Sequence, residues 1–141
     1  MKITKSLWLV ALLCCAPASV VMTGCGGGNS SIPAGTLPGS YFGTYEVTSG
    51  PDDGQTGTLS LTVASNGAIT GTVVSPQGSF GFTGTANTSS GSFSVTGLFN
   101  DTNGTGTGTI RSSSGVLRGS GQFTLSNNDA GTFTFAKVSI T

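Results

Sequence analysis

Histidine is absent from the 141 residues of the chain, and charged residues make up only 7% of them. Without histidine, the protein has no imidazole to act as a general base or as a metal ligand. After residue 24 the basic residues are Arg111, Arg118 and Lys137, against five acidic residues. So low a basic content excludes a nucleic-acid-binding surface. A net charge near zero also predicts no long-range attraction to phosphates or lipid headgroups.

Cysteine is confined to Cys14, Cys15 and Cys25. No disulfide can therefore form within the chain after residue 25, whose fold must depend on packing and on hydrogen bonds between strands. Long apolar runs are also lacking, because the stretch Leu7–Met22 is shorter than the roughly 20 residues that span a bilayer. This stretch follows Lys2 and Lys5 and precedes small residues, so it predicts an export signal at residues 1–24.

The residues Met22-Thr23-Gly24-Cys25 resemble the lipobox of bacterial lipoproteins, with Met22 in place of the usual Leu. The resemblance implies cleavage between Gly24 and Cys25, a diacylglyceryl group on the Cys25 sulfur, and a fatty acid such as palmitate on the new amino terminus. Gly26, rather than Asp, follows the cysteine, which by the same resemblance implies the outer membrane. The prediction is an exported protein held on the cell envelope by its lipid, with its orientation toward the periplasm or the cell surface left open. An ordinary secretory signal is the alternative.

The remaining chain divides into a tether and one domain. Residues 25–39 are rich in Gly, Ser and Pro and show neither helix nor strand periodicity, which predicts a lipidated cysteine followed by a flexible tether. Residues 40–141 are long enough for a single core, and their pattern predicts one all-β domain.

Apolar and polar residues alternate from Tyr41 onward, and turn residues recur about every ten positions. The pattern predicts eight strands and no helix, at residues 41–47, 58–63, 69–73, 80–86, 93–99, 105–110, 117–125 and 133–135. Asn66-Gly67 predicts a hairpin with a type I′ turn. The shift of the apolar positions to Val138 and Ile140 predicts a β-bulge near Ala136-Lys137.

The two faces of these strands differ in composition. One face carries aromatic and aliphatic residues interleaved with Gly, and the other carries almost only Thr and Ser. Alternating large and small residues fill the interior of a small barrel, and closure removes exposed strand edges. The predicted fold is an eight-stranded antiparallel up-and-down barrel, with a β-sandwich or a β-roll as the alternative. A barrel spanning an outer membrane is disfavoured, because the rings lie in the middle of short strands rather than at their ends.

Gly39-Ser40-Tyr41, Gly57–Val63 and Gly67–Val73 resemble the opening hairpins of the calycin superfamily, with Tyr41 at the place of the usual Trp. Lipocalin- and avidin-like proteins of this superfamily are eight-stranded up-and-down barrels that bind small ligands in the barrel mouth. The resemblance therefore implies the barrel, and it makes a ligand in the barrel an expectation.

Candidate catalytic residues are scarce. Lys137 is the only lysine after residue 24 and so the only one there that could activate a hydroxyl, and Glu46 is the only acid within a predicted strand. Both are interpreted as solvent-exposed charges. Residues 52–54 and 100–104 carry the oxygen-bearing side chains of calcium loops but not their ligand spacing, and turn formation accounts for them. The sequence predicts no enzyme, no metal site and no cofactor.

The predicted function is a non-enzymatic lipoprotein that displays a small β domain as a structural or interaction module. Its partners would be the membrane, through the lipid on Cys25, and envelope proteins. The alternative is a barrel that binds a small apolar ligand. Such a ligand would lie in a cavity lined by Tyr41, Tyr45, Phe80, Phe82, Phe93, Phe99, Phe123 and Phe133. Packing of these rings into a filled core is favoured over a cavity, because an eight-stranded barrel is just wide enough to be filled by its own side chains.

Overall fold

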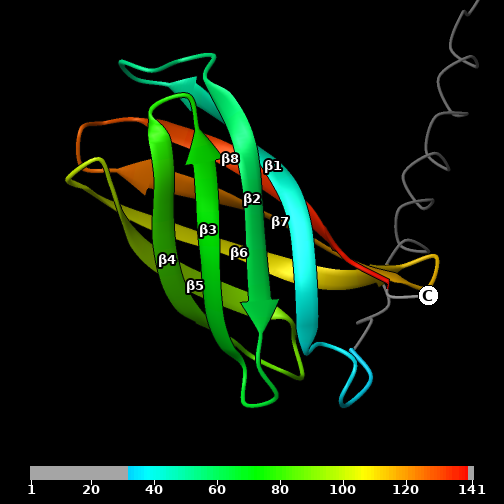
Figure 1. Cartoon of the computed structure of the whole chain (residues 1–141). Helices are drawn as coiled ribbons and strands as arrows, with labels where there is room; N and C mark the ends of the chain where they lie inside the picture. The colour runs from blue at the N-terminus through cyan, green and yellow to red at the C-terminus, as the bar shows by residue number, and fades with distance from the viewer. Residues whose placement is uncertain (1–31, 140–141) are drawn as a thin grey trace, which may run out of the picture. The chain divides into compact units, whose positions relative to one another are not determined.

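The computed structural model describes residues 32–139, and Figure 1 shows its ribbon. The predicted signal, the lipobox with Cys25 and the first part of the predicted tether lie outside the described residues. Between residues 32 and 139, no helix is long and apolar enough to cross a membrane.

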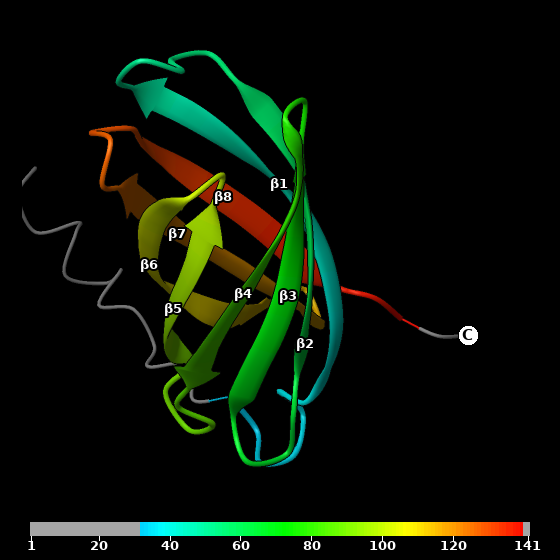
Figure 2. The ribbon, with the colours of Figure 1, turned by 60° about the vertical axis from the view of Figure 1, so that its left-hand side comes forward.

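Eight strands form one closed barrel, in which each strand pairs with the next and β8 pairs with β1. The strands are β1 (Gly39–Ser49), β2 (Thr56–Val63), β3 (Ala68–Ser75), β4 (Gly78–Ala86), β5 (Ser92–Phe99), β6 (Thr102–Ser113), β7 (Val116–Leu125) and β8 (Ala130–Lys137). Figure 2 shows β8 beside β1, where the ring closes. The predicted antiparallel up-and-down barrel is therefore confirmed. The sandwich and roll alternatives are wrong, because pairing of β1 with β8 leaves no open sheet.

The alternation of apolar and polar residues along the strands places apolar side chains inside the barrel and polar side chains on its outer face. On β1 the side chains of Tyr41, Tyr45 and Val47 are buried, whereas Phe42, Thr44 and Glu46 face solvent. Outward-facing threonines and serines lie opposite one another on neighbouring strands, as Thr44 does with Thr58 and Thr134. A Thr-covered outer face favours extended backbone and stays hydrated without many charges.

Aromatic rings on the inner face lie against glycines of the adjacent strand. The cross-strand pairs are Tyr45 with Gly57, Phe82 with Gly71, Phe93 with Gly108, Phe123 with Gly131, Phe133 with Gly121 and Phe135 with Gly119. A Cβ atom on Gly119 would lie 2.2 Å from the ring of Phe135, and one on Gly71 would lie 2.3 Å from the ring of Phe82. Each ring thus occupies the space that a side chain would take, and it lies along the barrel wall rather than across the interior.

One end of the barrel is closed by the segment that precedes β1. Ile32 and Leu37 are only 4% and 1% exposed and pack into the core. The Tyr41 hydroxyl donates a hydrogen bond of 2.6 Å to the Leu37 carbonyl, and the Lys137 ammonium donates to the Thr36 carbonyl. The prediction of a flexible tether up to residue 39 is therefore wrong for residues 32–39. Two apolar side chains in that polar segment are enough to bind it to the end of the barrel.

Two local predictions are also corrected. The hairpin at Asn66-Gly67 is present, but only Gly67 has a positive φ, and the amide of Ala64 bonds to the Ala68 carbonyl. A three-residue loop with one left-handed glycine therefore replaces the type I′ turn, which needs two positive φ values. The bulge lies between Val47 and Ser49, not near Ala136-Lys137, because β8 keeps its register as far as Lys137.

Because aromatic rings pack directly against glycines, adding a single methyl group at such a glycine should lower the stability of the protein. A Cβ on Gly121 would lie 2.3 Å from the Thr107 carbonyl oxygen and 2.6 Å from the Phe133 ring. Gly121→Ala should therefore lower the free energy of unfolding by about 1–3 kcal/mol, measured by urea denaturation. The matched control is Gly81→Ala, whose Cβ would meet nothing closer than 3.9 Å. A change within about 0.5 kcal/mol is expected there, and equal losses in both variants would contradict the packing argument.

Candidate ligand-binding cavity

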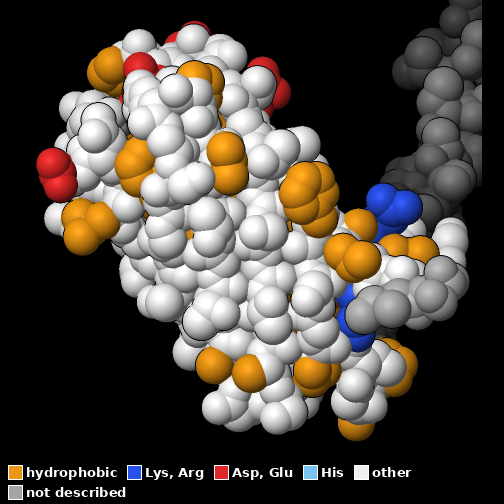
Figure 3. Space-filling model, in the orientation of Figure 1, with side chains coloured by type: hydrophobic (Ala, Val, Ile, Leu, Met, Phe, Trp, Pro, Cys, Tyr) orange, Lys and Arg blue, Asp and Glu red, His pale blue; other side chains and the backbone are white. Residues whose placement is uncertain are grey.

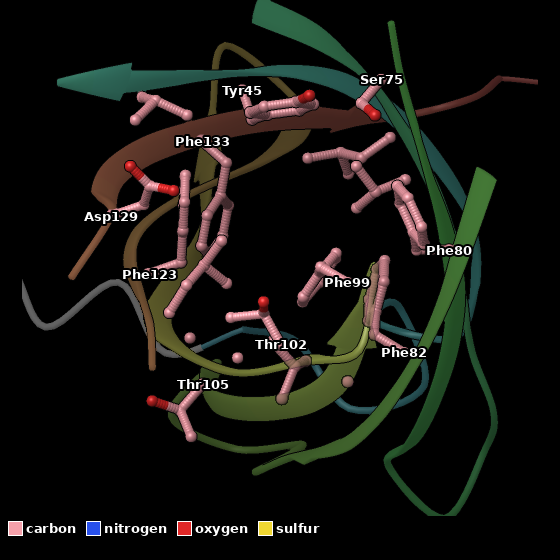
Figure 4. Close-up of a pocket in the computed structure, with 18 of the residues that line it drawn as sticks. Tyr45, Ser75, Phe80, Phe82, Phe99, Thr102, Thr105, Phe123, Asp129 and Phe133 are labelled. Atoms are coloured by element: carbon pink, nitrogen blue, oxygen red, sulfur yellow. The ribbon is translucent and has the colours of Figure 1, made fainter. Parts of the chain in front are cut away.

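The open half of the barrel encloses a cavity of about 170 Å³ (Figure 4). Its mouth lies at the end where the loops at residues 50–55, 76–77, 100–101 and 126–129 connect the strands. Pairing between β4 and β5 stops at Phe82 and Gly97, so these two strands separate toward the mouth and widen it. The favoured prediction of a completely filled interior is therefore wrong in the open half. Rings that lie along the wall leave space at the barrel axis.

The cavity wall contains every residue that the sequence predicted for it except Tyr41. In Figure 4, Phe123 and Phe133 lie on one side of the cavity, and Phe80, Phe82 and Phe99 lie on the other. The aliphatic side chains of Val47, Leu59, Leu61, Val73, Val95 and Leu125 complete the wall. Below the mouth, a small apolar compound would thus meet mainly carbon atoms.

The floor of the cavity is a cluster of stacked and tilted rings. Phe133 and Phe135 stack with ring centroids 6.1 Å apart, and Phe93 contacts both at 5.8 and 5.6 Å. Tyr41 lies below this layer, edge-on to Phe135 at 5.6 Å. Tyr41 therefore belongs to the closed end, and the expectation that it lines the cavity is wrong. Phe135, which the sequence analysis did not select, takes its place.

Polar side chains surround the mouth. They come from loops and strand ends and include Asp52, Gln55, Ser75, Gln77, Asn100, Thr102, Asn127 and Asp129. The sequence analysis attributed the polar residues at 52–54 and 100–104 to turn formation, because Asp and Asn stabilise turns by local bonds. The alternating pattern carries no signal for them, since it describes strands and not the loops that meet above the barrel.

Asp129 connects two of the mouth loops. Its side chain is 1% exposed. Its carboxylate accepts hydrogen bonds from the Asp52 amide at 2.9 Å and from the Asn127 side chain at 2.5 Å. Gly50 lies against this carboxylate, since a Cβ there would be 2.4 Å from an Asp129 oxygen. The acid therefore fixes the loop at residues 50–55 against the start of β8 and holds the mouth in shape.

Tyr45 provides a hydroxyl beside the mouth. The Tyr45 hydroxyl donates a hydrogen bond of 3.5 Å to the Gln55 side-chain oxygen. Burial raises the pKa of Tyr45 and the nearby Asp52 charge raises it further, whereas a hydrogen bond with Ser75 opposes them. The phenol therefore stays protonated at neutral pH and remains a hydrogen-bond donor.

The candidate catalytic residues lie away from the cavity wall. Lys137 bonds to the Thr36 carbonyl at the closed end, and Glu46 is exposed on the outer face of β1. Over residues 32–139, no group of three or more acids and cysteines is arranged to hold a metal ion. The cavity thus combines an apolar wall with a few neutral and acidic polar groups at its mouth.

Comparison with known proteins adds little to this geometry. No protein-family model and no curated protein matches the chain. The crystal structure of apo short afifavidin is similar to it, with 14% sequence identity and a TM-score of 0.46. The match covers 69% of this chain and 95% of that one. The barrel assignment rests on the strand pairing of this chain, which has the up-and-down order that the calycin resemblance implied.

The buried phenol under the cavity floor predicts a loss of stability at high pH. Burial raises the pKa of Tyr41 to about 12 from its ordinary value of 10.0. The unfolded chain therefore releases this proton near pH 10, whereas the folded protein retains it until about pH 12. The free energy of unfolding should stay level up to pH 10 and then fall with rising pH until about 12.

Tyr41→Phe is the control for this pH dependence. It should cost about 1–3 kcal/mol at neutral pH, because the buried Leu37 carbonyl loses its donor. It should also make the decline above pH 10 shallower, as measured by urea titrations at each pH. A variant with the full alkaline decline would show that another group is responsible.

Proposed function

We propose that the protein is a non-enzymatic lipoprotein whose barrel binds a small, largely apolar ligand through its open end. The observation that carries the proposal is the cavity of about 170 Å³ between facing aromatic rings. A cavity of roughly 150 Å³ lined by apolar side chains can hold a molecule the size of benzene. The ligand class is therefore a compound of one or two small rings, or a short branched hydrocarbon chain.

The mouth supports a ligand with one polar group. Binding pockets commonly combine an apolar wall with a few polar groups that set the orientation of the ligand. Here the Tyr45 hydroxyl is the donor, and the side chains of Gln55 and Ser75 lie beside it. A ligand with its ring between Phe82 and Phe133 would direct an acceptor toward Tyr45, and this acceptor would replace the Gln55 oxygen as the partner of the single phenol proton. The Asp129 network would hold this arrangement before binding, so that little ordering of loops is required.

A structural or interaction module remains the second prediction. The large apolar side chains exposed over residues 32–139 are Phe42, Val74, Leu98 and Val138, and they come from four separate strands or strand ends. Single exposed apolar residues are common on protein surfaces. These four scattered side chains are therefore weaker support for an interaction module than the cavity is for a bound ligand.

The lipid anchor is the other half of the proposal. It is supported by the lipobox resemblance at Met22–Cys25. Ile32 packs at the closed end, so a tether from Cys25 would join the barrel opposite its mouth. A ligand could then enter from the side away from the attachment point.

Filling the cavity should abolish ligand binding without unfolding the barrel. The test uses the chain from residue 25 with Cys25→Ser, recovered from the producing cells and examined by native mass spectrometry and by NMR titration with indole. Val73→Phe adds a ring inside the cavity, whereas Val74→Phe adds the same ring on the exposed outer face of β3. Indole binding should weaken at least about tenfold in Val73→Phe and stay unchanged in Val74→Phe. Equal affinity of both variants, together with a bare mass for the parent protein, would refute the ligand proposal.

The anchor predicts a defined mass. Intact-mass analysis of the membrane fraction should find a chain that begins at Cys25 and carries a diacylglyceryl group and an amide-linked acyl chain. Cys25→Ser should prevent lipidation and move the protein out of its membrane form. Cys14→Ser is the matched control, because Cys14 would be removed with the signal. An unmodified thiol at residue 25 would refute the anchor and leave the ligand proposal intact.

A further inference from the structure

We propose that the closed end of the barrel docks directly on an anionic lipid bilayer, through Arg111, Arg118 and Phe42. The proposal rests on the lipid anchor at Cys25, since that anchor brings the closed end to a membrane. It adds a second contact, made by the barrel itself, and with it a fixed orientation of the cavity.

The fold places the basic and the acidic side chains of the described residues at opposite ends of the barrel. Within residues 32–139 the bases are Arg111, Arg118 and Lys137, and each lies near the closed end on β6, β7 or β8. The acids Glu46, Asp52, Asp53, Asp101 and Asp129 lie in the mouth loops or near the open end of β1. In Figure 3 the acidic and basic side chains occupy opposite parts of the visible face. The sequence predicted no long-range attraction to lipid headgroups from the net charge. The closed end, however, carries only positive charges over the described residues and can be attracted to anionic headgroups.

The two arginines form an unfavourable pair. Arg111 and Arg118 lie directly opposite each other on β6 and β7, and both side chains are exposed. Like charges in this position repel and destabilise a sheet. The next outward-facing residues on the two strands are Thr109, Ser113, Val116 and Ser120, none of which is acidic. A phosphate group from outside the protein would relieve the repulsion by accepting hydrogen bonds from both guanidinium groups.

An aromatic ring lies in the same row. Arg118 pairs with Ala136, and Ala136 pairs with Phe42, so the row crosses from β7 through β8 to β1. Phe42 is 54% exposed, and a shallow depression lined by Phe42, Arg111 and Arg118 runs between the ring and the guanidinium groups. Cations beside an exposed ring suit the boundary between lipid headgroups and acyl chains. A phospholipid would place its phosphate between the arginines and its glycerol region near Phe42.

The length of the chain before the barrel limits how far this face can be from a membrane. Residues 25–32 span at most about 25 Å when fully extended. A lipid on Cys25 would therefore hold the closed end close to the headgroups, where each basic side chain strengthens attachment to an anionic leaflet. The acidic mouth would be repelled by the same leaflet. Docking at the closed end thus directs the cavity away from the bilayer.

The experiment attaches the protein to vesicles without depending on natural lipidation. Cys25 is the only cysteine after residue 24, so the purified chain from residue 25 can be coupled through its thiol to maleimide-bearing phosphatidylethanolamine. The vesicles contain brominated phosphatidylcholine with 30 or 0 mole per cent phosphatidylglycerol. Trp8 precedes residue 25, so Phe42→Trp creates the only tryptophan of the coupled chain. Val74→Trp is the matched control, because Val74 is an exposed outer residue near the mouth.

The tryptophan at position 42 should be quenched by the brominated lipid and its emission shifted to the blue on vesicles with phosphatidylglycerol. The tryptophan at position 74 should show neither change. Arg111→Gln with Arg118→Gln should lower the ratio of docked to undocked protein by about 25-fold, because each cation near the surface contributes about a factor of five. The same double variant should be at least as stable as the parent in urea, since it removes a like-charge pair.

Three results would overturn the docking proposal. They are equal quenching at positions 42 and 74, equal quenching with and without phosphatidylglycerol, and unchanged quenching in the double arginine variant. Each result is measured on protein that is attached chemically through Cys25, so it does not test whether the natural lipid anchor exists. The natural anchor is tested separately by the intact mass at Cys25.

Discussion

The packing of aromatic rings against glycines of the neighbouring strand underlies both the shape of this barrel and its interior. Phe133 lies on Gly121 and Phe135 lies on Gly119, each across one strand pairing. In the closed half these rings meet one another and fill the interior. In the open half the rings stay on the wall, and the space along the axis becomes the cavity. The glycine content, which would weaken an ordinary sheet, is therefore the reason that a ring-lined interior fits inside eight strands.

The two ends of the barrel have different chemistry, and the proposed function depends on that difference. The closed end is sealed by Ile32 and Leu37 and carries the exposed arginines, whereas the mouth is polar and acidic. The proposed tether would join the barrel at its closed end and would leave the mouth accessible. In the proposed arrangement the membrane contact and the ligand contact would use opposite ends of the barrel.

The alternation of apolar and polar residues was sufficient to predict the strands and most of the side chains that line the cavity. It favoured a closed barrel over a sandwich or a roll, and the pairing of β1 with β8 decided between them. Tyr45, Phe82 and Phe123 were assigned to the interior because period-two alternation places every second residue on the same face. The same pattern misplaced Tyr41, because alternation indicates the face of a residue but not its height along the barrel. The alternation also failed to predict that Ile32 and Leu37 close one end of the barrel, since two apolar residues in a polar segment have no helix or strand periodicity.

The amino-acid order alone determines the number of strands, their inner and outer faces, the lack of cysteine after residue 25 and the lack of histidine. These properties depend on residue type and on near neighbours. The cavity, the mouth and the separation of charge follow from contacts between distant positions. The Asp52 amide meets the Asp129 carboxylate 77 residues away, and Lys137 meets Thr36 101 residues away. Closing the barrel brings such positions together, and no local pattern specifies which end stays open or which side chains meet there.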